Sequence, residues 1–350
     1  MTAWRENIRR VTPYVPGEQP KDTGIIKLNT NENPYGPSPR VKVINENMDM
    51  LRLYPDPTAS LLVDELARYH GVDSSQVFVG VGSDDVLAMS FMTFFNSEKP
   101  ILFPDITYSF YDVWAELFRI PYERPALDEN FRLVKEDYDK ENGGIVFPNP
   151  NAPTGIYEPL DNIEEIIKNN LSSIVIVDEA YIDFGGETAL PLIDQYDNLV
   201  VVRTFSKSRS MAGLRIGYAI SNSELIKALN DVKYSYNSYT MNRPSIIMGA
   251  ESVKDEEYFR KTVEKVIHTR EKFVEDIKSL GFSCLPSSAN FVFATHERIP
   301  AKEIFEAAKK AKIYVRYFDA PRINNYLRIS IGTDEEMAAF VSFLKEYTKL

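Results

Sequence analysis

The sequence predicts an α/β protein in which a large domain with a mostly parallel sheet covered by helices precedes a smaller α+β domain. Three observations support this prediction. The chain has 350 residues, which is more than one hydrophobic core usually holds. Short β-branched runs alternate with helical stretches up to about residue 250, as in a parallel sheet with crossover helices. Beyond that point a long charged helix leads into a second set of strands.

The chain begins with a segment rich in proline and polar residues, which excludes a long helix or a central strand there. We therefore expect residues 1–28 to form an extended arm. The large domain is expected over residues 29–250 and starts with an amphipathic helix near 61–69. Its buried strands are predicted from six short apolar runs flanked by polar turns: 77–79, 101–103, 145–147, 174–177, 199–202 and 216–220.

The smaller domain is expected over residues 251–350. A long charged amphipathic helix over 251–280 ends at Gly281 and would connect the two domains. The remaining elements are predicted as strands over 290–294, 313–318 and 326–331, with helices near 301–312 and 335–349.

Composition excludes several classes of function. The formal net charge of −11 argues against a nucleic-acid partner, because a polyanion is bound by clustered Lys and Arg, and it favours small-molecule partners. No apolar run approaches the roughly 20 residues that span a bilayer, so no membrane partner is expected. The N-terminus lacks an apolar stretch and Cys284 is the only cysteine, which predicts a cytoplasmic protein without an intrachain disulfide. The three histidines are scattered, so we expect no metal site.

Chemically distinctive residues follow two neighbouring strands. Asp178 and Tyr181 come directly after the run 174–177, and Ser206, Lys207 and Arg215 follow the run 199–202. One helical crossover fits between the two groups, so both would reach the crevice at the carboxyl ends of the strands. A lysine that can form an imine, with a carboxylate that can keep a pyridine nitrogen protonated, is the pair that pyridoxal-5′-phosphate chemistry requires.

A doubly charged phosphate also needs hydroxyl groups, backbone N–H groups at the start of a helix, and a cation. The turn Gly82-Ser83-Asp84 lies between the strand 77–79 and a helical stretch, so its N–H groups would point at an anion. Ser206 and Arg215 could supply the hydroxyl and the cation. Each of these signals is weak alone, and their order and spacing carry the prediction.

At this point the chain resembles the fold-type I pyridoxal-phosphate-dependent aminotransferases, and more narrowly the histidinol-phosphate aminotransferases. The resemblance extends over essentially the whole sequence. It rests on motifs that occur in the order found in that family: LNTNENPYGPSP, YPDP, VGVGSDD, NPNAPTG, VDEAYIDF, RTFSKSRSMAGLRIGY and LRISIGT.

The resemblance implies roles for individual residues. Lys207 would hold the cofactor as a Schiff base, Asp178 would pair with the pyridine nitrogen, Tyr181 would contact the ring oxygen, and Tyr108 would stack on the ring. The phosphate would be held by Gly82, Ser83, Asp84, Ser206 and Arg215, together with Tyr54 from a second subunit. A homodimer with a shared active site is therefore implied. On the substrate side, the resemblance points to Tyr14, Arg316 and Arg328.

The family also implies the reaction, which is amino transfer between L-histidinol phosphate and 2-oxoglutarate in histidine biosynthesis. The products are imidazole-acetol phosphate and L-glutamate. Two alternatives stay open on sequence alone. One is an aminotransferase for tyrosine and phenylalanine, which the Tyr-rich pocket would also suit. The other is a pyridoxal-phosphate-dependent decarboxylase of an amino-acid phosphate.

The sequence departs from the family in one motif. Many relatives have a second asparagine where this chain has Ala152, so the amide expected to bind the ring oxygen is missing. Asn151 or Asn149 could substitute for it, and we take Asn151 as the candidate. Tyr181 would then carry more of this contact alone.

Overall fold

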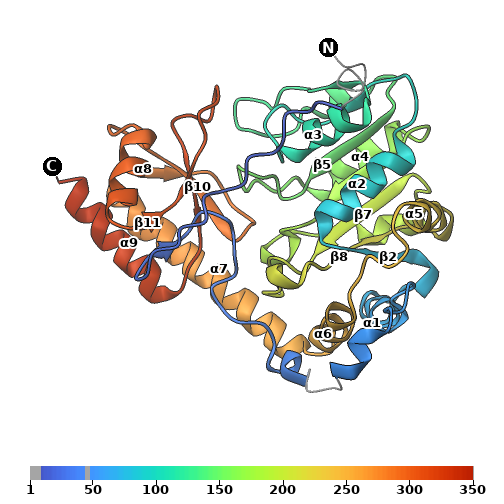
Figure 1. Cartoon of the computed structure of the whole chain (residues 1–350). Helices are drawn as coiled ribbons and strands as arrows, with labels where there is room; N and C mark the ends of the chain where they lie inside the picture. Colours follow the sequence, from blue (N-terminus) through green and yellow to red (C-terminus); the bar gives the residue numbers. More distant parts are fainter. Residues whose placement is uncertain (1–8, 44–47, 350) are drawn as a thin grey trace, which may run out of the picture.

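The computed structural model describes residues 9–43 and 48–349, which form two lobes of unequal size (Figure 1). The larger lobe is built on a seven-stranded sheet, and the smaller lobe on a four-stranded sheet. The long helix α7 (Glu256–Lys278) runs between the lobes (Figure 1). None of the helices within the described residues has the length and apolarity needed to cross a membrane.

The large sheet has the strand order β2-β8-β7-β6-β5-β3-β4. Its neighbouring strands are parallel except for β8, which runs antiparallel to both β2 and β7. This arrangement confirms the predicted mostly parallel sheet. The strands are β2 (Val77–Gly80), β3 (Ile101–Leu102), β4 (Tyr122–Glu123), β5 (Gly144–Pro148), β6 (Val175–Asp178), β7 (Leu199–Thr204) and β8 (Gly217–Ile220).

Helices cover both faces of this sheet. Successive strand residues point to opposite faces, so alternate residues of one strand pack against different helices. Val175 and Val177 of β6 join one apolar cluster with helices α1, α4 and α6, whereas Ile176 joins another with α2, α3 and α5. Fully apolar strands are what a sheet buried on both faces requires. The helices of this lobe are α1 (Ser60–His70), α2 (Ser83–Phe94), α3 (Phe110–Phe118), α4 (Leu160–Asn169), α5 (Ser223–Tyr236) and α6 (Arg243–Val253).

The small lobe is an antiparallel sheet of order β12-β13-β10-β9, packed against helices. Its apolar core joins α7, α8 and α9 to β10 and β13. The elements are β9 (Phe282–Cys284), β10 (Phe291–His296), α8 (Ala301–Lys310), β11 (Ile313–Tyr314), β12 (Arg316–Tyr317), β13 (Leu327–Ser330) and α9 (Asp334–Tyr347).

Two expectations about elements were wrong in detail. The helix predicted over 251–280 is divided, because α6 ends at Val253 and α7 starts at Glu256. Asp255 caps the second helix by accepting a hydrogen bond from the Tyr258 backbone N–H, so the helix starts at this residue. The strand predicted over 313–318 is also divided, because β11 and β12 belong to different sheets.

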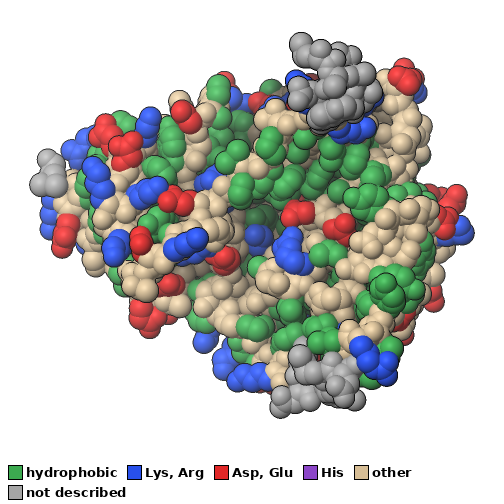
Figure 2. Space-filling view, viewed as in Figure 1, with side chains coloured by type: hydrophobic (Ala, Val, Ile, Leu, Met, Phe, Trp, Pro, Cys, Tyr) green, Lys and Arg blue, Asp and Glu red, His purple; other side chains and the backbone are tan. Residues whose placement is uncertain are grey.

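Residues 1–8 of the expected arm lie outside the described residues, and the described part, 9–28, contains no helix and contributes one strand. β1 (Ile26–Lys27) pairs in parallel with β11 of the small lobe. Further toward the N-terminus, the ring of Tyr14 stacks on Phe110 of α3 in the large lobe with centroids 4.1 Å apart. The arm therefore links both lobes across the face on which Figure 2 shows a hollow.

Candidate active site

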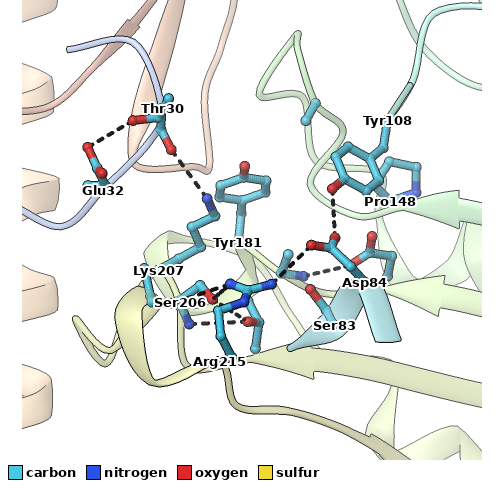
Figure 3. A pocket seen from close by; sticks show the side chains of 15 residues that line it. Thr30, Glu32, Ser83, Asp84, Tyr108, Pro148, Tyr181, Ser206, Lys207 and Arg215 are labelled. Carbon is cyan, nitrogen blue, oxygen red and sulfur yellow. Dashed lines mark hydrogen bonds and ion pairs between the residues drawn. The ribbon is translucent and has the colours of Figure 1, made fainter. Parts of the chain in front are cut away.

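A cavity of about 240 Å³ lies where strands β5, β6 and β7 end, opposite the first turn of α2 (Figure 3). The arm closes one side of it with Thr30 and Glu32. Parallel strands bring their carboxyl ends to one edge, which explains why residues far apart in sequence meet here. The lining residues are Thr30, Glu32, Ser83, Asp84, Tyr108, Pro148, Ala152, Asp178, Ala180, Tyr181, Thr204, Ser206, Lys207, Ala212 and Arg215.

Lys207 projects into the cavity beside Tyr181 (Figure 3). Its Nζ lies 3.4 Å from the carbonyl oxygen of Thr30, to which it donates, and 5.6 Å from the centre of the Tyr181 ring. The Tyr181 hydroxyl accepts a hydrogen bond from Asn31 Nδ2 at 3.0 Å. The backbone of the lysine loop is held as well, because Asn33 Nδ2 donates to the carbonyl oxygen of Lys207 at 3.1 Å.

Asp178 provides a buried carboxyl group at the end of β6. Burial raises its pKa to about 6, although hydrogen bonds from the Tyr111 hydroxyl and from the backbone N–H of Ala180 work in the opposite direction. Tyr111 Oη donates at 3.0 Å and Ala180 N at 3.1 Å. A carboxyl group in such surroundings is strongly favoured to ionise when a cation is bound next to it.

The opposite end of the cavity forms a cradle for an anion. Arg215 lies there with its Nη2 3.1 Å from Asp84 Oδ2, and its Nη1 donates to Ser206 Oγ at 3.4 Å. Gly82 has φ +86°, and a Cβ atom at this position would lie 2.5 Å from Arg215 Nη2, so only glycine leaves the guanidinium its place. Ser83 and Asp84 begin α2, and their N–H groups belong to the first turn of that helix.

Tyr108 joins this cradle to the cavity wall. Its hydroxyl donates to Asp84 Oδ1 at 2.7 Å. Burial, together with the negative charge of Asp84, raises the pKa of Tyr108 well above its usual value. The phenol therefore stays protonated, and its ring presents an aromatic surface to the cavity.

A second cavity of about 380 Å³ adjoins the first and shares Lys207, Tyr181 and Arg215 with it. Tyr14, Arg316 and Arg328 also line this second cavity, so the structure brings together the three residues expected on the substrate side. Arg328 Nη2 donates to the carbonyl oxygen of Asn29 at 3.1 Å, whereas its buried Nε finds no acceptor among the described residues. Burial, helped by the charge of Arg316, lowers the pKa of Arg328. An anion bound here would accept a hydrogen bond from Nε and would favour the charged form of Arg328.

Three expected residues do not line either cavity. The first is Gly82, which lies against the guanidinium of Arg215 behind the cavity wall. The side chain of Tyr54 is 78% exposed and its ring stacks on Tyr239 with centroids 4.7 Å apart. Asn151 is buried and donates from Nδ2 to the carbonyl oxygen of Ile106 and to Thr154 Oγ1, both at 3.1 Å. The neighbouring Ala152 faces the first cavity instead.

Sequence reasoning missed Thr30, Glu32 and Tyr111. The first two belong to the polar run 29–33, directly after the expected arm, and no strand or helix pattern in this run points to a cavity wall. Burial opposes ionisation of Glu32, but hydrogen bonds from Lys27 and Thr30 lower its pKa overall, so this carboxylate is charged beside Lys207. Tyr111 gives no sequence signal, because one tyrosine in a helix resembles any core aromatic residue.

Comparisons of the sequence with known proteins point to one family. The family model for aminotransferases of class I and II matches residues 23–344. A histidinol-phosphate aminotransferase from Lactococcus lactis subsp. lactis (strain IL1403) is 52% identical over 99% of this chain and 97% of its own length.

Solved structures share the fold. The histidinol-phosphate aminotransferase from Clostridium acetobutylicum superimposes with a TM-score of 0.86 at 23% identity, covering 93% of this chain and 99% of that one. The enzyme of the same name from Sinorhizobium meliloti, solved in complex with pyridoxal-5′-phosphate, gives a TM-score of 0.84 at 22% identity, covering 93% and 91%.

The residues around the first cavity fit a phosphorylated pyridine aldehyde in three respects. A lysine amine reaches the cavity, a buried carboxyl group stands at the strand end to pair with a ring cation, and a cradle with an arginine and a helix start can take the phosphate. The close approach of Gly82 to Arg215 shows that this cradle depends on the absence of a side chain at position 82.

Proposed function

Because this chain belongs to the class I and II aminotransferases, and within them to the histidinol-phosphate aminotransferases, we propose that it transfers the amino group between L-histidinol phosphate and 2-oxoglutarate. It is a pyridoxal-phosphate-dependent enzyme of histidine biosynthesis. The observation that carries the proposal is the convergence of Lys207, the buried Asp178 and the Arg215 cradle on one cavity.

Each residue that lines the cavity has a proposed role. Lys207 Nζ would bind the cofactor's aldehyde carbon, and Asp178 would hold the proton of the pyridine nitrogen in place. Bound in this way, pyridoxal phosphate supplies an electron sink for the charge that develops at the substrate's α-carbon. Ser206 and Arg215, with the turn at Gly82, Ser83 and Asp84, would bind its phosphate.

Lys207 would also move the proton. Once the substrate's amine has taken its place, Nζ is free to accept the proton from the substrate's α-carbon. The carbonyl oxygen of Thr30, 3.4 Å from Nζ, supports this role. It accepts a hydrogen bond that orients the amine, and it adds no formal negative charge beside it. Tyr181 and Tyr108 would position the ring, and Tyr181 has its own hydroxyl fixed by Asn31.

Arg316, Arg328 and Tyr14 are proposed to bind the substrate's phosphate in the second cavity. The buried Nε of Arg328 supports this assignment, because it has no hydrogen-bond acceptor among residues 9–43 and 48–349. A planar guanidinium group also suits a carboxylate, so the same arginines would accept glutamate and 2-oxoglutarate in the other half of the reaction.

The test of the reaction is amino transfer measured with one preparation and three donors, namely histidinol phosphate, tyrosine and phenylalanine. We expect kcat/KM to be highest for histidinol phosphate. Glutamate should convert the bound cofactor to its pyridoxamine form, as seen in the visible spectrum, which a decarboxylase would not do. Reduction with borohydride should leave the cofactor on Lys207, and an adduct on any other residue would overturn the site assignment.

We further propose that the enzyme is a homodimer in which the partner's Tyr54 completes the phosphate site. Its exposed position supports this, because Tyr239, which stacks on it, and Leu51 and Leu53, close to it in sequence, are exposed too, and exposed apolar side chains that cluster favour association. The biosynthetic role of the family, together with the single cysteine, supports a cytoplasmic location.

Mixing two damaged variants tests the shared site. Lys207→Ala cannot bind the cofactor covalently, and Tyr54→Ala weakens the phosphate site of its partner. A mixed dimer contains one site with both defects and one site with neither, so mixing should restore activity. If each site lies within a single chain, mixing will restore nothing.

A further inference from the structure

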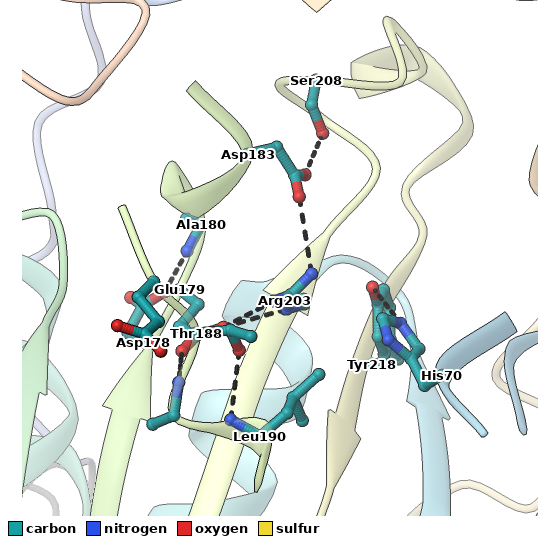
Figure 4. A network of polar contacts seen from close by, with 12 residues as sticks. His70, Asp178, Glu179, Ala180, Asp183, Thr188, Leu190, Arg203, Ser208 and Tyr218 are labelled. Carbon is teal, nitrogen blue, oxygen red and sulfur yellow. Dashed lines mark hydrogen bonds and ion pairs between the residues drawn. The ribbon is translucent and has the colours of Figure 1, made fainter. Parts of the chain in front are cut away.

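A buried polar network lies beside the cavity without lining it (Figure 4). At its centre is Arg203, near the end of β7, whose side chain is only 10% exposed. The guanidinium reaches two carboxylates, Glu179 on one side and Asp183 on the other. Neither the reaction proposed above nor the cofactor site uses any of these groups directly.

The first branch of the network is an ion pair with Glu179. Arg203 donates from Nε at 3.0 Å and from Nη2 at 2.8 Å, both to Glu179 Oε2. The remaining acceptor positions of Glu179 are filled by the backbone N–H of Ala189 and the hydroxyl of Thr188. Burial raises the pKa of Glu179 and the charge of Arg203 opposes this rise. In return, Glu179 raises the pKa of Arg203 in spite of its burial.

The second branch reaches the lysine loop. Arg203 Nη1 lies 3.4 Å from Asp183 Oδ1, and the other oxygen, Oδ2, accepts a hydrogen bond from Ser208 Oγ at 2.5 Å. Asp183 belongs to the short helix η6 (Ile182–Phe184), which directly follows Tyr181. Ser208 directly follows Lys207. One arginine therefore connects the strand end of β6 with the lysine loop.

The residues of this network are close in sequence to residues that line the cavity. Glu179 is adjacent to Asp178, Ser208 is adjacent to Lys207, and Asp183 lies two residues after Tyr181. Asp178, Tyr181 and Lys207 line the cavity, whereas Glu179, Asp183 and Ser208 do not. A side chain fixed in this way fixes the direction of its neighbour, because the two share one stretch of backbone.

We propose that Arg203 is a positioning residue that sets the place of Lys207 Nζ relative to Asp178 and Tyr181 through these two branches. The inference rests on the proposed function, and it adds Arg203, Asp183 and Ser208 as a unit that acts through the cavity residues. Ion pairs buried this deeply are weak sources of stability, which agrees with a role in geometry.

The branch through Ser208 can be cut with little change to the fold. We expect Ser208→Ala, in the cofactor-loaded enzyme, to lower kcat on the order of tenfold, because a lysine displaced by a fraction of an ångström loses its approach to the α-carbon. KM for histidinol phosphate should change by less than about twofold, since the substrate's phosphate contacts are intact. The pH midpoint of the cofactor's visible absorbance should also shift, by about half a unit or more, because the distance from the imine nitrogen to Tyr181 changes.

Ser210→Ala is the matched control. Ser210 belongs to the same loop, and its buried Oγ has no hydrogen-bond partner among the described residues, so its removal should leave kcat and the visible titration as in the wild type. Asp183→Ala cuts the same branch from the other side. The double variant of Asp183 and Ser208 should therefore lose no more activity than Asp183→Ala alone, because both substitutions remove one shared contact.

Arg203→Lys keeps the charge beside Glu179 but cannot span both carboxylates, because an ammonium group lacks the planar fork. It should resemble Asp183→Ala in kcat and in the visible titration. If Arg203→Lys does not fold, the Ser208 and Asp183 variants still decide the question.

The outcomes separate the two proposals. A wild-type enzyme that fails to transfer amino groups refutes the proposed function. An active wild type together with a Ser208→Ala variant that equals it in kcat and in titration refutes the positioning role. Equal losses in Ser208→Ala and Ser210→Ala would refute it too, because the effect would then belong to the loop in general.

Discussion

At the scale of single residues, Asp178 couples the cavity's chemistry to the protein's stability. In the cofactor-free protein, burial disfavours the charged form and raises the pKa of Asp178 from its ordinary value of 3.8 to about 6. Folded protein therefore holds this proton to higher pH than the unfolded chain does. As the pH rises from about 4 to about 6, folding loses up to about 3 kcal/mol through this group.

Asp178→Asn removes this loss. We expect the cofactor-free variant to have a higher free energy of unfolding than the wild type at about pH 7.5, and a smaller advantage at about pH 5, as measured by urea denaturation. Adding pyridoxal phosphate should stabilise the wild type more than the variant, because only the carboxylate pairs with the ring cation. An equal advantage at both pH values would contradict this account.

Ala152 offers a second test at this scale. It lines the cavity at the position where many relatives have asparagine, and Asn151 beside it is engaged with Ile106 and Thr154. We expect Ala152→Asn to move the pH midpoint of the bound cofactor's absorbance, because a new amide would donate to the ring oxygen. A spectrum that titrates as in the wild type would show that the amide does not reach the ring.

Much of the site could be predicted from the sequence, because its residues stand directly after strands or at a helix start. Lys207, Asp178, Tyr181 and Ser206 are such residues, Arg215 lies in the same loop as Lys207, and all of them line the cavity. Their chemical roles stay predictions. Tyr111, Thr30 and the Arg203 network could not be found in this way, because their importance comes from contacts between segments that are distant in sequence.

At the scale of elements, the cradle proposed to bind the phosphate depends on how closely β8 approaches the start of α2. A Cβ atom on Gly217 would lie 2.3 Å from the Gly82 carbonyl carbon and 2.3 Å from the Ser83 nitrogen, which are backbone atoms that cannot yield easily. Gly217→Ala should therefore displace the turn. Overpacking of this kind costs about 1–3 kcal/mol. Borne by the phosphate site, this cost raises the dissociation constant of pyridoxal phosphate by roughly 5- to 150-fold.

Gly213→Ala is the control for this prediction, because no heavy atom lies within 4 Å of its added Cβ. Absorbance titration of each cofactor-free variant gives the dissociation constants. Equal affinity of the Gly217 and Gly213 variants would show that the approach of β8 to the turn is unimportant for binding.

The six strands predicted for the large lobe were all found, because runs of apolar β-branched residues are required by burial on both faces. The two-residue strand β4 was missed, since Tyr122–Glu123 has one exposed and one partly exposed side chain and no period to detect. The helix predicted over 251–280 also extended across the break between α6 and α7, where Asp255 caps the second helix. The domain limit at residue 250 stays a prediction.

At the scale of the whole molecule, the arm connects the two lobes over the second cavity, where we propose that the substrate binds. Its strand β1 belongs to the small lobe, whereas Tyr14 packs on α3 of the large lobe. We expect Tyr14→Ala to raise KM for histidinol phosphate by roughly two- to tenfold through loss of the aromatic stack and of the cavity wall. The dissociation constant of the cofactor should stay unchanged, because Tyr14 does not line the first cavity.

Tyr14→Phe separates the two contributions of this residue. The phenylalanine ring keeps the stack on Phe110, so an intermediate KM would assign the remainder to the hydroxyl group and its contact with the substrate. Steady-state kinetics of both variants provide the comparison, and a wild-type KM in Tyr14→Ala would remove the arm from the binding site.

The arm has a consequence for how the protein is made. The backbone N–H of Leu28, the last residue of the arm, donates to the carbonyl oxygen of Tyr314, and that of Asn31 donates to the hydroxyl of Ser330, so residues about 300 positions apart must meet before this wall of the cavity is complete. Such distant pairings form late in folding. Until these pairings form, the cavity would lack the wall that Thr30 and Glu32 provide.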